Sequence, residues 1–314
     1  MRRSGLRDTD RHAGETGGER ARREARDERA RGAEGHVDRL AAFRDSERFF
    51  RCPVCGHDLR LDEGSLRCDN GHCFDVARSG YVNLAPRARP SHHYTKESFA
   101  QRMAILAQGC YAHVADELER TLDGLPHVRT ILDAGCGEGF YARRLSERPG
   151  RDVLAFDISK DSVLMASRHD PGHAVRWFVG DLTEIPVRSG AIDCVVDVFS
   201  PANYREFARV LTPDGLVVKV VPASDHLREI REVAKAQLRS ATYSNERVVR
   251  RFAACHEVLG RTRTTATRAV TPEVVTAFAQ MTPLLFSVDA ATIDLADVRE
   301  VTIDAEVLVG RPRT

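Results

Sequence analysis

The chain has 314 residues, and 42% of them are hydrophobic, which is enough to bury the core of one large domain or two modest ones. Lys and Arg number 47 against 46 Asp and Glu, so a net charge of +1 gives no overall preference for a polyanion. No apolar run approaches the roughly 20 residues that span a bilayer. The N-terminal residues contain no apolar segment of the kind that a secretory signal needs, so we expect a cytoplasmic protein without membrane contact.

Residues 1–36 form a charged tail in which Leu6 is the one large apolar side chain after Met1. Such a segment buries too little surface to offset the entropy of ordering, so we expect disorder. A solvated extension is the favoured interpretation, and an RNA-contacting arm is the alternative. A helical pattern begins only at Val37, and the sequence leaves open whether translation of the native protein starts near that residue.

A cysteine cluster follows the tail. Cys52 and Cys55 form a C-x2-C turn, and Cys68 and His72 form a C-x3-H turn after a twelve-residue spacer. Three thiolates and one imidazole make a tetrahedral ligand set that Zn²⁺ prefers. Four protein ligands leave no open position, so one structural ion is predicted. Cys73 is the alternative to His72 as the fourth ligand.

The most specific pattern lies between residues 131 and 157. An apolar run enters a loop with Gly135, Gly137 and Gly139, a helical pattern follows, and a second apolar run ends in Asp157. Glycines let a ligand approach the loop backbone, and an acid at the tip of the second strand reaches ribose hydroxyls. The unit predicts a nucleoside-type cofactor. Its G-x-G-x-G spacing resembles motif I of the S-adenosylmethionine-dependent methyltransferases.

Strand and helix patterns alternate through the rest of the chain. Strands are predicted at Val175–Val179, Ile192–Phe199, Gly215–Val221, Thr262–Ala269 and Val298–Val309, and helices at Tyr204–Leu211, 225–240 and 245–258. This alternation predicts an α/β fold with a Rossmann-like, doubly wound sheet, preceded by the small zinc-binding module.

Ligands of such sheets bind beyond the carboxyl ends of the strands, where several notable side chains follow the predicted strands. Asp181 is a candidate to accept from an adenine amino group, with a helix cap as the alternative. Phe199 or Tyr204 could stack on an extruded base, and core packing explains either equally well. Asp197 is the one candidate for a catalytic base, on position alone.

The order of these motifs resembles one family. The zinc turns, the segment FDVARSGYVNL (Phe74–Leu84), a helical linker and the methyltransferase core are similar to the bacterial 23S rRNA guanine-N1 methyltransferases over Val37–Thr314. The resemblance implies methyl transfer to N1 of a guanine in a hairpin loop of 23S rRNA. Some members confer resistance to tylosin-type macrolides. Which of two neighbouring guanines is the target, and whether this chain confers resistance, stay open.

The resemblance also implies site residues. The family's zinc ligands fall on the same three cysteines and on His72, and its cofactor contacts fall on Tyr111, Tyr141, Ala142 and His226. Cys110 occupies a position where the family commonly has histidine, so a role for that histidine does not carry over to this chain.

The predicted organisation is a charged tail at 1–36, a zinc-binding RNA-recognition module at 37–90, a helical linker at 91–125 and a methyltransferase domain at 126–314. We expect S-adenosylmethionine and one Zn²⁺ as cofactors, an rRNA hairpin and a second copy of the chain as partners, and no DNA. RNA contacts are expected at Arg51, Arg60 and Arg67 and along residues 85–96. A solvated linker is an equally good interpretation of residues 85–96. A small-molecule methyltransferase with a structural zinc finger and a non-catalytic zinc-ribbon RNA-binding protein are the alternatives.

Overall fold

The computed structural model describes residues 38–88, 95–238, 243–282, 285 and 293–313. The chain divides into the units Met1–Asp38 and Arg39–Thr314, and the description below concerns the second. The tail at 1–36 and part of the linker at 85–96 lie outside the described residues. Among the helices that the structure describes, none is both long and apolar enough to cross a membrane.

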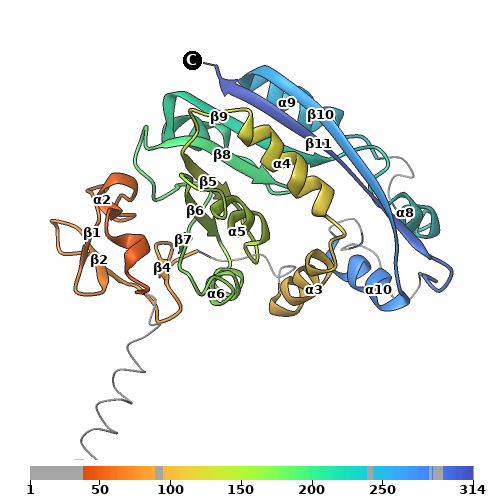
Figure 1. Cartoon of the computed structure of the whole chain (residues 1–314), viewed down its shortest axis with the longest axis horizontal. Helices are drawn as coiled ribbons and strands as arrows, with labels where there is room; N and C mark the ends of the chain where they lie inside the picture. The colour runs from red at the N-terminus through yellow and green to blue at the C-terminus, as the bar shows by residue number, and fades with distance from the viewer. Residues whose placement is uncertain (1–37, 89–94, 239–242, 283–284, 286–292, 314) are drawn as a thin grey trace, which may run out of the picture. The chain divides into compact units, whose positions relative to one another are not determined.

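A sheet of eight strands runs through the molecule in the order β10-β11-β9-β8-β5-β6-β7-β4 (Figure 1). The strands are β4 (Tyr81–Asn83), β5 (Thr130–Ala134), β6 (Asp152–Asp157), β7 (Val175–Val179), β8 (Ile192–Val198), β9 (Leu211–Pro222), β10 (His256–Ala269) and β11 (Glu300–Pro312). Neighbours from β4 to β9 are parallel. The Rossmann-like fold and each predicted strand are therefore confirmed.

The two C-terminal strands depart from the parallel pattern. β11 pairs antiparallel with β9, and β10 pairs antiparallel with β11 over almost its whole length. The predicted helix at 245–258 ends earlier, as α9 (Glu246–Cys255), because β10 begins at His256. The predicted helix at 225–240 is shorter too: α8 covers Arg228–Val233, and residues 239–242 lie outside the described part of the chain.

One face of the sheet carries most of the helices. These are α3 (Lys96–Ala107), α4 (Ala112–Asp123), α5 (Phe140–Ser146), α6 (Lys160–Arg168), α8 and α10 (Pro272–Met281). Their apolar side chains join those of alternate strand residues, such as Ile131 and Val153, in one buried cluster. Because successive strand residues point to opposite faces, Leu132 and Leu154 belong to the core on the other side.

The opposite face is covered by α7 (Tyr204–Val210), α9 and the N-terminal module. The stretch between β7 and β8 is fully described and holds no helix, and module residues pack there instead. Phe50 meets Phe178 edge to face with ring centroids 5.1 Å apart, and it forms a backbone bridge with Val187. β4 continues the sheet beside β7, so the module shares this core.

The helical pattern predicted from Val37 is not one helix. It contains the short 3-10 turn η1 (Ala41–Phe43) and the single turn α2 (Ser46–Phe49), while Val37 lies outside the described residues. The hydroxyl of Ser46 donates to the carbonyl of Phe43, which occupies an acceptor that a continuous helix would use. The break lets Phe43 and Phe50 both reach the core beneath the sheet.

Candidate functional site

The predicted metal ligands converge at the end of a small three-stranded sheet. Strands β1 (Arg60–Asp62), β2 (Ser65–Arg67) and β3 (Cys73–Asp75) form an antiparallel meander, and the two ligand turns flank it. The ligand atoms of Cys52, Cys55, Cys68 and His72 all lie within 4.8 Å of one another. The imidazole Nδ1 of His72 is 3.5 Å from Cys52 Sγ and 3.4 Å from Cys68 Sγ, and the thiols of Cys55 and Cys68 are 3.7 Å apart.

These separations fit a tetrahedral zinc ion, because bonds of about 2.3 Å to sulfur and about 2.0–2.1 Å to nitrogen hold the ligand atoms less than about 4 Å apart. Cys73, the alternative fourth ligand, is exposed on β3 and is not part of this group. The backbone amide of Val54 donates to Cys52 Sγ at 3.4 Å, a bond that a metal-bound thiolate can keep. The geometry therefore favours His72 over Cys73.

A cavity of about 480 Å³ opens beyond the carboxyl ends of β5, β6 and β7. It is lined by the glycine loop, the residues after β6 and β7, and the loop after β8; the lining includes Phe99, Gly135, Gly137, Asp157, Ile158, Asp181, Leu182, Phe199 and Ser200. We call it the first cavity. Its position is the one expected for ligands of parallel α/β sheets.

The three loop glycines all adopt positive φ, but they serve different purposes. A Cβ on Gly135 would lie 2.0 Å from Ser200 Oγ, and one on Gly139 would lie 2.4 Å from the Trp177 ring. Those two positions are needed for close packing. A Cβ on Gly137 would make ordinary contacts only, 3.8 Å from Phe99, so this backbone faces the first cavity and is free for a ligand.

Asp157, the last residue of β6, lines the first cavity and anchors the glycine loop. Its Oδ2 accepts from the Gly137 amide at 3.0 Å, and its Oδ1 accepts from the Ser159 amide at 2.9 Å. Burial raises the pKa of this carboxyl, while the two amide bonds act in the opposite direction. A carboxylate held in this way retains lone pairs that can accept from ribose hydroxyls.

Asp181 follows β7 and also lines the first cavity. Its Oδ1 accepts from both the amide and the hydroxyl of Thr183, each at 2.7 Å, so Asp181 closes a turn and does not cap a helix, because no helix follows β7 in this described stretch. Both bonds use Oδ1. Oδ2 can therefore accept from an exocyclic amino group without breaking the turn.

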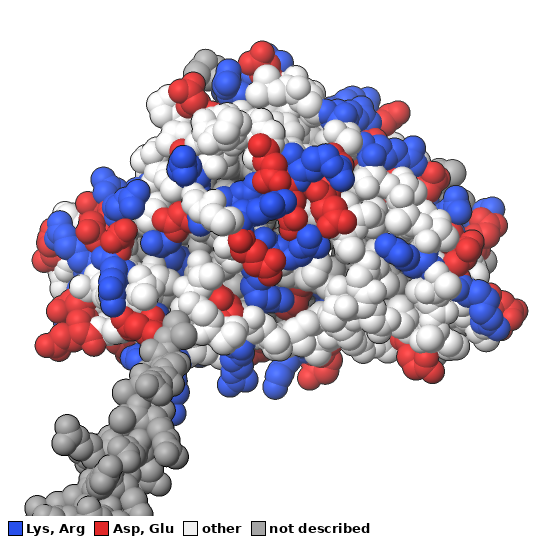
Figure 2. All heavy atoms as spheres, viewed as in Figure 1, with Lys and Arg blue, Asp and Glu red and all other residues white. Residues whose placement is uncertain are grey.

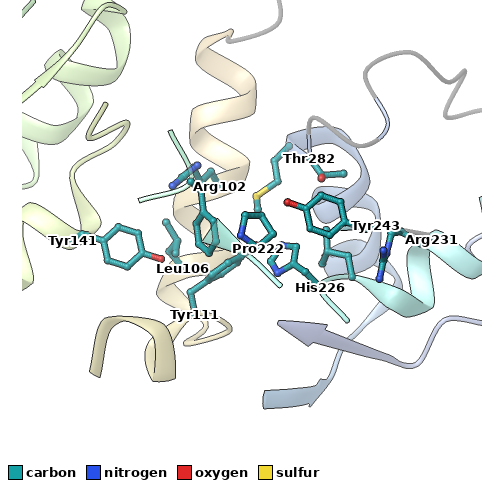
Figure 3. Close-up of a pocket in the computed structure, with 12 residues that line it drawn as sticks. Arg102, Leu106, Tyr111, Tyr141, Pro222, His226, Arg231, Tyr243 and Thr282 are labelled. Atoms are coloured by element: carbon teal, nitrogen blue, oxygen red, sulfur yellow. The ribbon is translucent and has the colours of Figure 1, made fainter. Parts of the chain in front are cut away.

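A second cavity of about 280 Å³ adjoins the first, and Arg102 and Phe199 line both (Figure 3). Three of the four cofactor contacts implied by the family resemblance, Tyr111, Tyr141 and His226, line this second cavity and not the first. Ala142 is fully buried on α5 and lines neither. A cofactor whose nucleoside occupies the first cavity would reach the tyrosines only with its methionyl end.

Two residues of the second cavity are held in a conformation that side chains rarely adopt. Phe199 and Leu227 have φ values of 54° and 53°, in the left-handed region. Strained backbone of this kind persists where surrounding contacts determine it, and it concentrates at ligand sites. Lys219 on β9 supports the loop after β8. Its ammonium donates to the carbonyl of Ser200 in that loop at 3.0 Å and to Oδ2 of Asp197 on β8 at 2.7 Å.

That ion pair corrects the prediction for Asp197. Its side chain is fully buried beside Lys219 and lines neither cavity, so it supports the loop and does not reach a substrate. Burial raises its pKa to about 6, against the opposing effect of Lys219. Position at a strand end was a poor guide here, because the side chain alternates to the face away from the cavities.

The two base-stacking candidates also separate. Phe199 lines both cavities, whereas Tyr204 lies on α7 and packs edge to face against Phe252 and His256 in the core beneath the sheet. Five residues apart in the sequence, they face opposite sides of the sheet. Only Phe199 remains a candidate for contact with a substrate.

Arg102 was not predicted from the sequence. It lies on α3, lines both cavities, and its Nε is 3.2 Å from Glu138 Oε2, where Glu138 is the acid within the glycine loop. An arginine in a helical linker carries no local signal. The acid between two loop glycines was the available clue, since a buried carboxylate calls for a cationic partner.

The site combines a glycine loop that faces a cavity with carboxylates at the end of β6 and just after β7. Together with a mixed sheet that ends in an antiparallel pair, these features define an S-adenosylmethionine-dependent methyltransferase that carries a structural zinc ribbon. Residues 131–215 match a family model described as a methyltransferase domain, and residues 50–89 match the zinc-ribbon model described as RlmA, N-terminal.

Relatives extend over most of the chain. It is 33% identical over 275 residues to the 23S rRNA (guanine(748)-N(1))-methyltransferase of Streptomyces fradiae, and this match covers 84% of this chain and 97% of the relative. It is 32% identical over 277 residues to YxjB of Bacillus subtilis, provisionally named a 23S rRNA (guanine-N(1)-)-methyltransferase, which covers 83% and 96%. The chain belongs to the family of 23S rRNA (guanine-N1)-methyltransferases.

Proposed function

We propose that this chain transfers a methyl group from S-adenosylmethionine to N1 of a guanine in a hairpin loop of 23S rRNA. The observation that carries the proposal is the pair of connected cavities: one is built for a nucleoside, and the other is lined by aromatic and cationic side chains. Relatives with guanine-N1 methyltransferase names match 83% and 84% of the chain.

The residues of the first cavity would hold the nucleoside part of the cofactor. Asp157 accepts from the ribose hydroxyls, Asp181 Oδ2 accepts from the adenine amino group, and the backbone at Gly137 allows close approach. Arg102 and Tyr141 line the second cavity and would hold the methionyl end, because a guanidinium suits its carboxylate. Tyr141 Oη is buried without a hydrogen-bond partner among the described residues, which fits a ligand there.

When bound, the cofactor supplies a methyl group on a positively charged sulfur, which is its own leaving group. The protein's task is to hold guanine N1 in line with that methyl group and to assist loss of the N1 proton. Zinc takes no part in this step, because four protein ligands close its coordination. Its role is to hold the ribbon together, since so small a module has too little core of its own.

The rRNA surface includes the ribbon arginines in this proposal. Arg60 lies 2.9 Å from Asp69, Arg67 lies 3.2 Å from Asp62, and Arg51 lies 3.6 Å from Glu184. The pairs of Arg60 and Arg67 are exposed and contribute less than about 1 kcal/mol each, so a phosphate can replace the carboxylate there, while Arg51 is partly buried.

A second copy of the chain would complete the RNA-binding surface. On the face in Figure 2, Lys and Arg side chains alternate with Asp and Glu, without a broad basic area. One near-neutral protomer therefore offers limited attraction to a folded hairpin. We propose a homodimer that acts in the cytoplasm, where it would meet its rRNA. Sedimentation of the purified protein tests the dimer.

Primer extension on 23S rRNA tests the function. A methyl group on guanine N1 blocks the base-pairing edge, so reverse transcriptase should stop at one position in the parent strain, and the stop should vanish when the gene is deleted. Restoring the gene should restore the stop. Identical patterns in all three strains would refute the proposal and favour the small-molecule alternative.

A further inference from the structure

The end of the second cavity opposite Tyr141 contains a buried arginine with an unused donor. Arg231, on α8, is 9% exposed and lines the second cavity but not the first (Figure 3). One terminal nitrogen donates to the carbonyl of Ser224, and Nε has no hydrogen-bond partner among the described residues. A buried, unpaired guanidinium donor is costly, which points to a ligand that completes it.

Aromatic rings surround the same space. The Arg231 guanidinium lies 5.7 Å from the centroid of the Tyr243 ring, and the rings of Phe199 and His226 have centroids 5.7 Å apart. Flat apolar surfaces beside a planar donor match a planar aromatic ligand that carries an acceptor at its edge. Burial lowers the pKa of His226 to about 4, so its imidazole adds no charge to the cavity wall at neutral pH.

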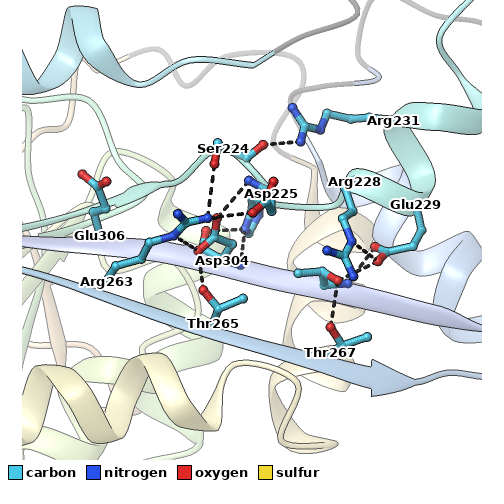
Figure 4. A network of polar contacts seen from close by, with 12 residues as sticks. Ser224, Asp225, Arg228, Glu229, Arg231, Arg263, Thr265, Thr267, Asp304 and Glu306 are labelled. Atoms are coloured by element: carbon cyan, nitrogen blue, oxygen red, sulfur yellow. Dashed lines mark hydrogen bonds and ion pairs between the residues drawn. The ribbon is translucent and has the colours of Figure 1, made fainter.

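The wall that carries His226 is fixed from behind by the antiparallel strand pair (Figure 4). Asp304 on β11 is fully buried and accepts from Arg263 Nε at 2.8 Å, from Thr265 Oγ1 at 2.6 Å and from the Asp225 amide at 2.9 Å. His226 Nδ1 lies 3.1 Å from the Asp304 carbonyl oxygen. The cavity is therefore organised before any ligand enters.

We propose that the part of the second cavity bounded by Phe199, Arg231 and Tyr243 receives the extruded guanine beside His226, where the base meets the methionyl end of the cofactor, and that Arg231 donates a hydrogen bond to the O6 of that guanine. The inference rests on the proposed function and names the residue that recognises the substrate base. Arg231 thereby selects a purine with a 6-oxo group, because the amino group at that position of adenine would leave the buried guanidinium unpaired.

The same contact promotes the chemistry. Neutral guanine carries a proton on N1; when that proton leaves to water, negative charge spreads over N1 and O6. The N1 electron pair then forms the bond to the methyl carbon, and the carbon–sulfur bond breaks with its electron pair going to the sulfonium sulfur. A guanidinium at O6 stabilises this anion, and a donor fixed in a largely buried position does so more strongly than a mobile one in bulk water.

Arg102 and Arg231 serve two different anionic groups in this proposal: Arg102 the methionyl carboxylate of the cofactor, and Arg231 the deprotonated guanine. Arg102 borders both cavities and lies beside the glycine loop, as a methionyl carboxylate requires. Arg231 borders only the second cavity. Substitutions at the two arginines should therefore separate cofactor affinity from the methylation rate.

The experiment compares Arg231→Gln and Arg231→Lys with Arg228→Gln, a matched change at an arginine on the same helix whose side chain is 53% exposed. Single-turnover methylation of a 23S rRNA hairpin is followed across a pH range, and cofactor affinity and thermal stability are measured for each variant. We expect Arg231→Gln to slow methylation by roughly 100- to 1,000-fold at neutral pH, the effect of losing one oxyanion donor.

The difference in methylation rate between the parent and Arg231→Gln should narrow as the pH rises, because hydroxide then removes the N1 proton without help. The cofactor affinity of Arg231→Gln should stay within about twofold of the parent value. Arg231→Lys should retain part of the rate, and Arg228→Gln all of it. An unchanged rate in Arg231→Gln, a gap that is constant with pH, or a parallel loss of cofactor affinity would overturn the assignment. A parent protein that makes no N1-methylguanosine would instead overturn the proposed function, and the inference with it.

A binding measurement covers the case of a misfolded variant. With a fluorescent guanine analogue that keeps the 6-oxo group at the target position, stacking on Tyr243 should quench the fluorescence in the complex, and Tyr243→Leu should weaken the quenching while RNA affinity stays within a fewfold. Equal quenching in both proteins would contradict a base bound beside Tyr243.

Discussion

The metal cluster and the second cavity are both built from a few side chains, but they are assembled in opposite ways. The four zinc ligands lie within 21 residues of sequence, on two turns that flank one small meander. The second cavity draws on α3, the start of α4, α5, the loop after β8, α8 and the residues before α9. Its lining residues span 181 positions, from Arg102 to Thr282.

The difference lies in what determines each site. Paired turns bring ligands together through local geometry, and zinc supplies the remaining free energy. The second cavity depends on the topology of the whole sheet, because β11 must lie beside β9 before Asp304 can hold His226. Damage to the zinc ligands should therefore affect folding of the ribbon, whereas damage to the cavities should affect binding and rate.

The largest effect is expected from Cys52→Ser. Loss of one thiolate should abolish zinc binding, which in isolated zinc fingers contributes about 10–16 kcal/mol of apparent folding free energy. Zinc content should fall from one per chain to near zero, and thermal unfolding should begin at a much lower temperature. Cys73→Ser, at the exposed neighbour outside the cluster, is the matched control and should change neither quantity. Full zinc content in Cys52→Ser would refute the ligand set.

Gly137→Asp should abolish cofactor binding while the protein stays folded. The new carboxylate would enter the first cavity beside Asp157, and φ of 57° strains any side chain there. Calorimetric titration with S-adenosylmethionine should detect no heat of binding. Gly172→Asp, at a glycine where an added Cβ would meet no atom within 4 Å, should bind as the parent does. Parental affinity in Gly137→Asp would remove the glycine loop from the cofactor site.

Asp157→Ala should weaken cofactor binding by about 1–3 kcal/mol, the usual contribution of hydrogen bonds to a charged acceptor. Part of that loss arises because the amides of Gly137 and Ser159 lose their acceptor and the loop loosens. Equilibrium titration at several temperatures measures the change. An affinity within a factor of two of the parent value would mean that ribose is held elsewhere.

The smallest effect is expected from Tyr204→Phe. Its ring packs edge to face against Phe252 and His256 and lines neither cavity, so removing the hydroxyl should change kcat/KM with an rRNA hairpin by less than about twofold. The same substrate serves for the comparison with Phe199→Leu, which should be clearly slower. A tenfold loss in Tyr204→Phe with unchanged stability would reverse the roles assigned to these two residues.

Local spacing explains what could be predicted from the sequence. The glycine loop, Asp157 and the ligand turns are each set by contacts between near neighbours, and alternating strand and helix patterns predicted the sheet. Asp197 does not reach a cavity, because side chains alternate between the two faces of a sheet along a strand. For Tyr204 the sequence left base stacking and core packing open, and the structure shows core packing. Arg102, Arg231 and Tyr243 were missed because only the folded sheet brings their segments to one cavity.

The most direct test of the account is methyl transfer by the purified zinc-containing protein. The protein is incubated with labelled S-adenosylmethionine and unmodified 23S rRNA, and the product is digested for mass spectrometry and mapped by primer extension. We predict N1-methylguanosine at one loop position, approaching one methyl group per rRNA, and none with Gly137→Asp. Label that appears in another nucleoside, at many positions or only in small molecules would contradict the account.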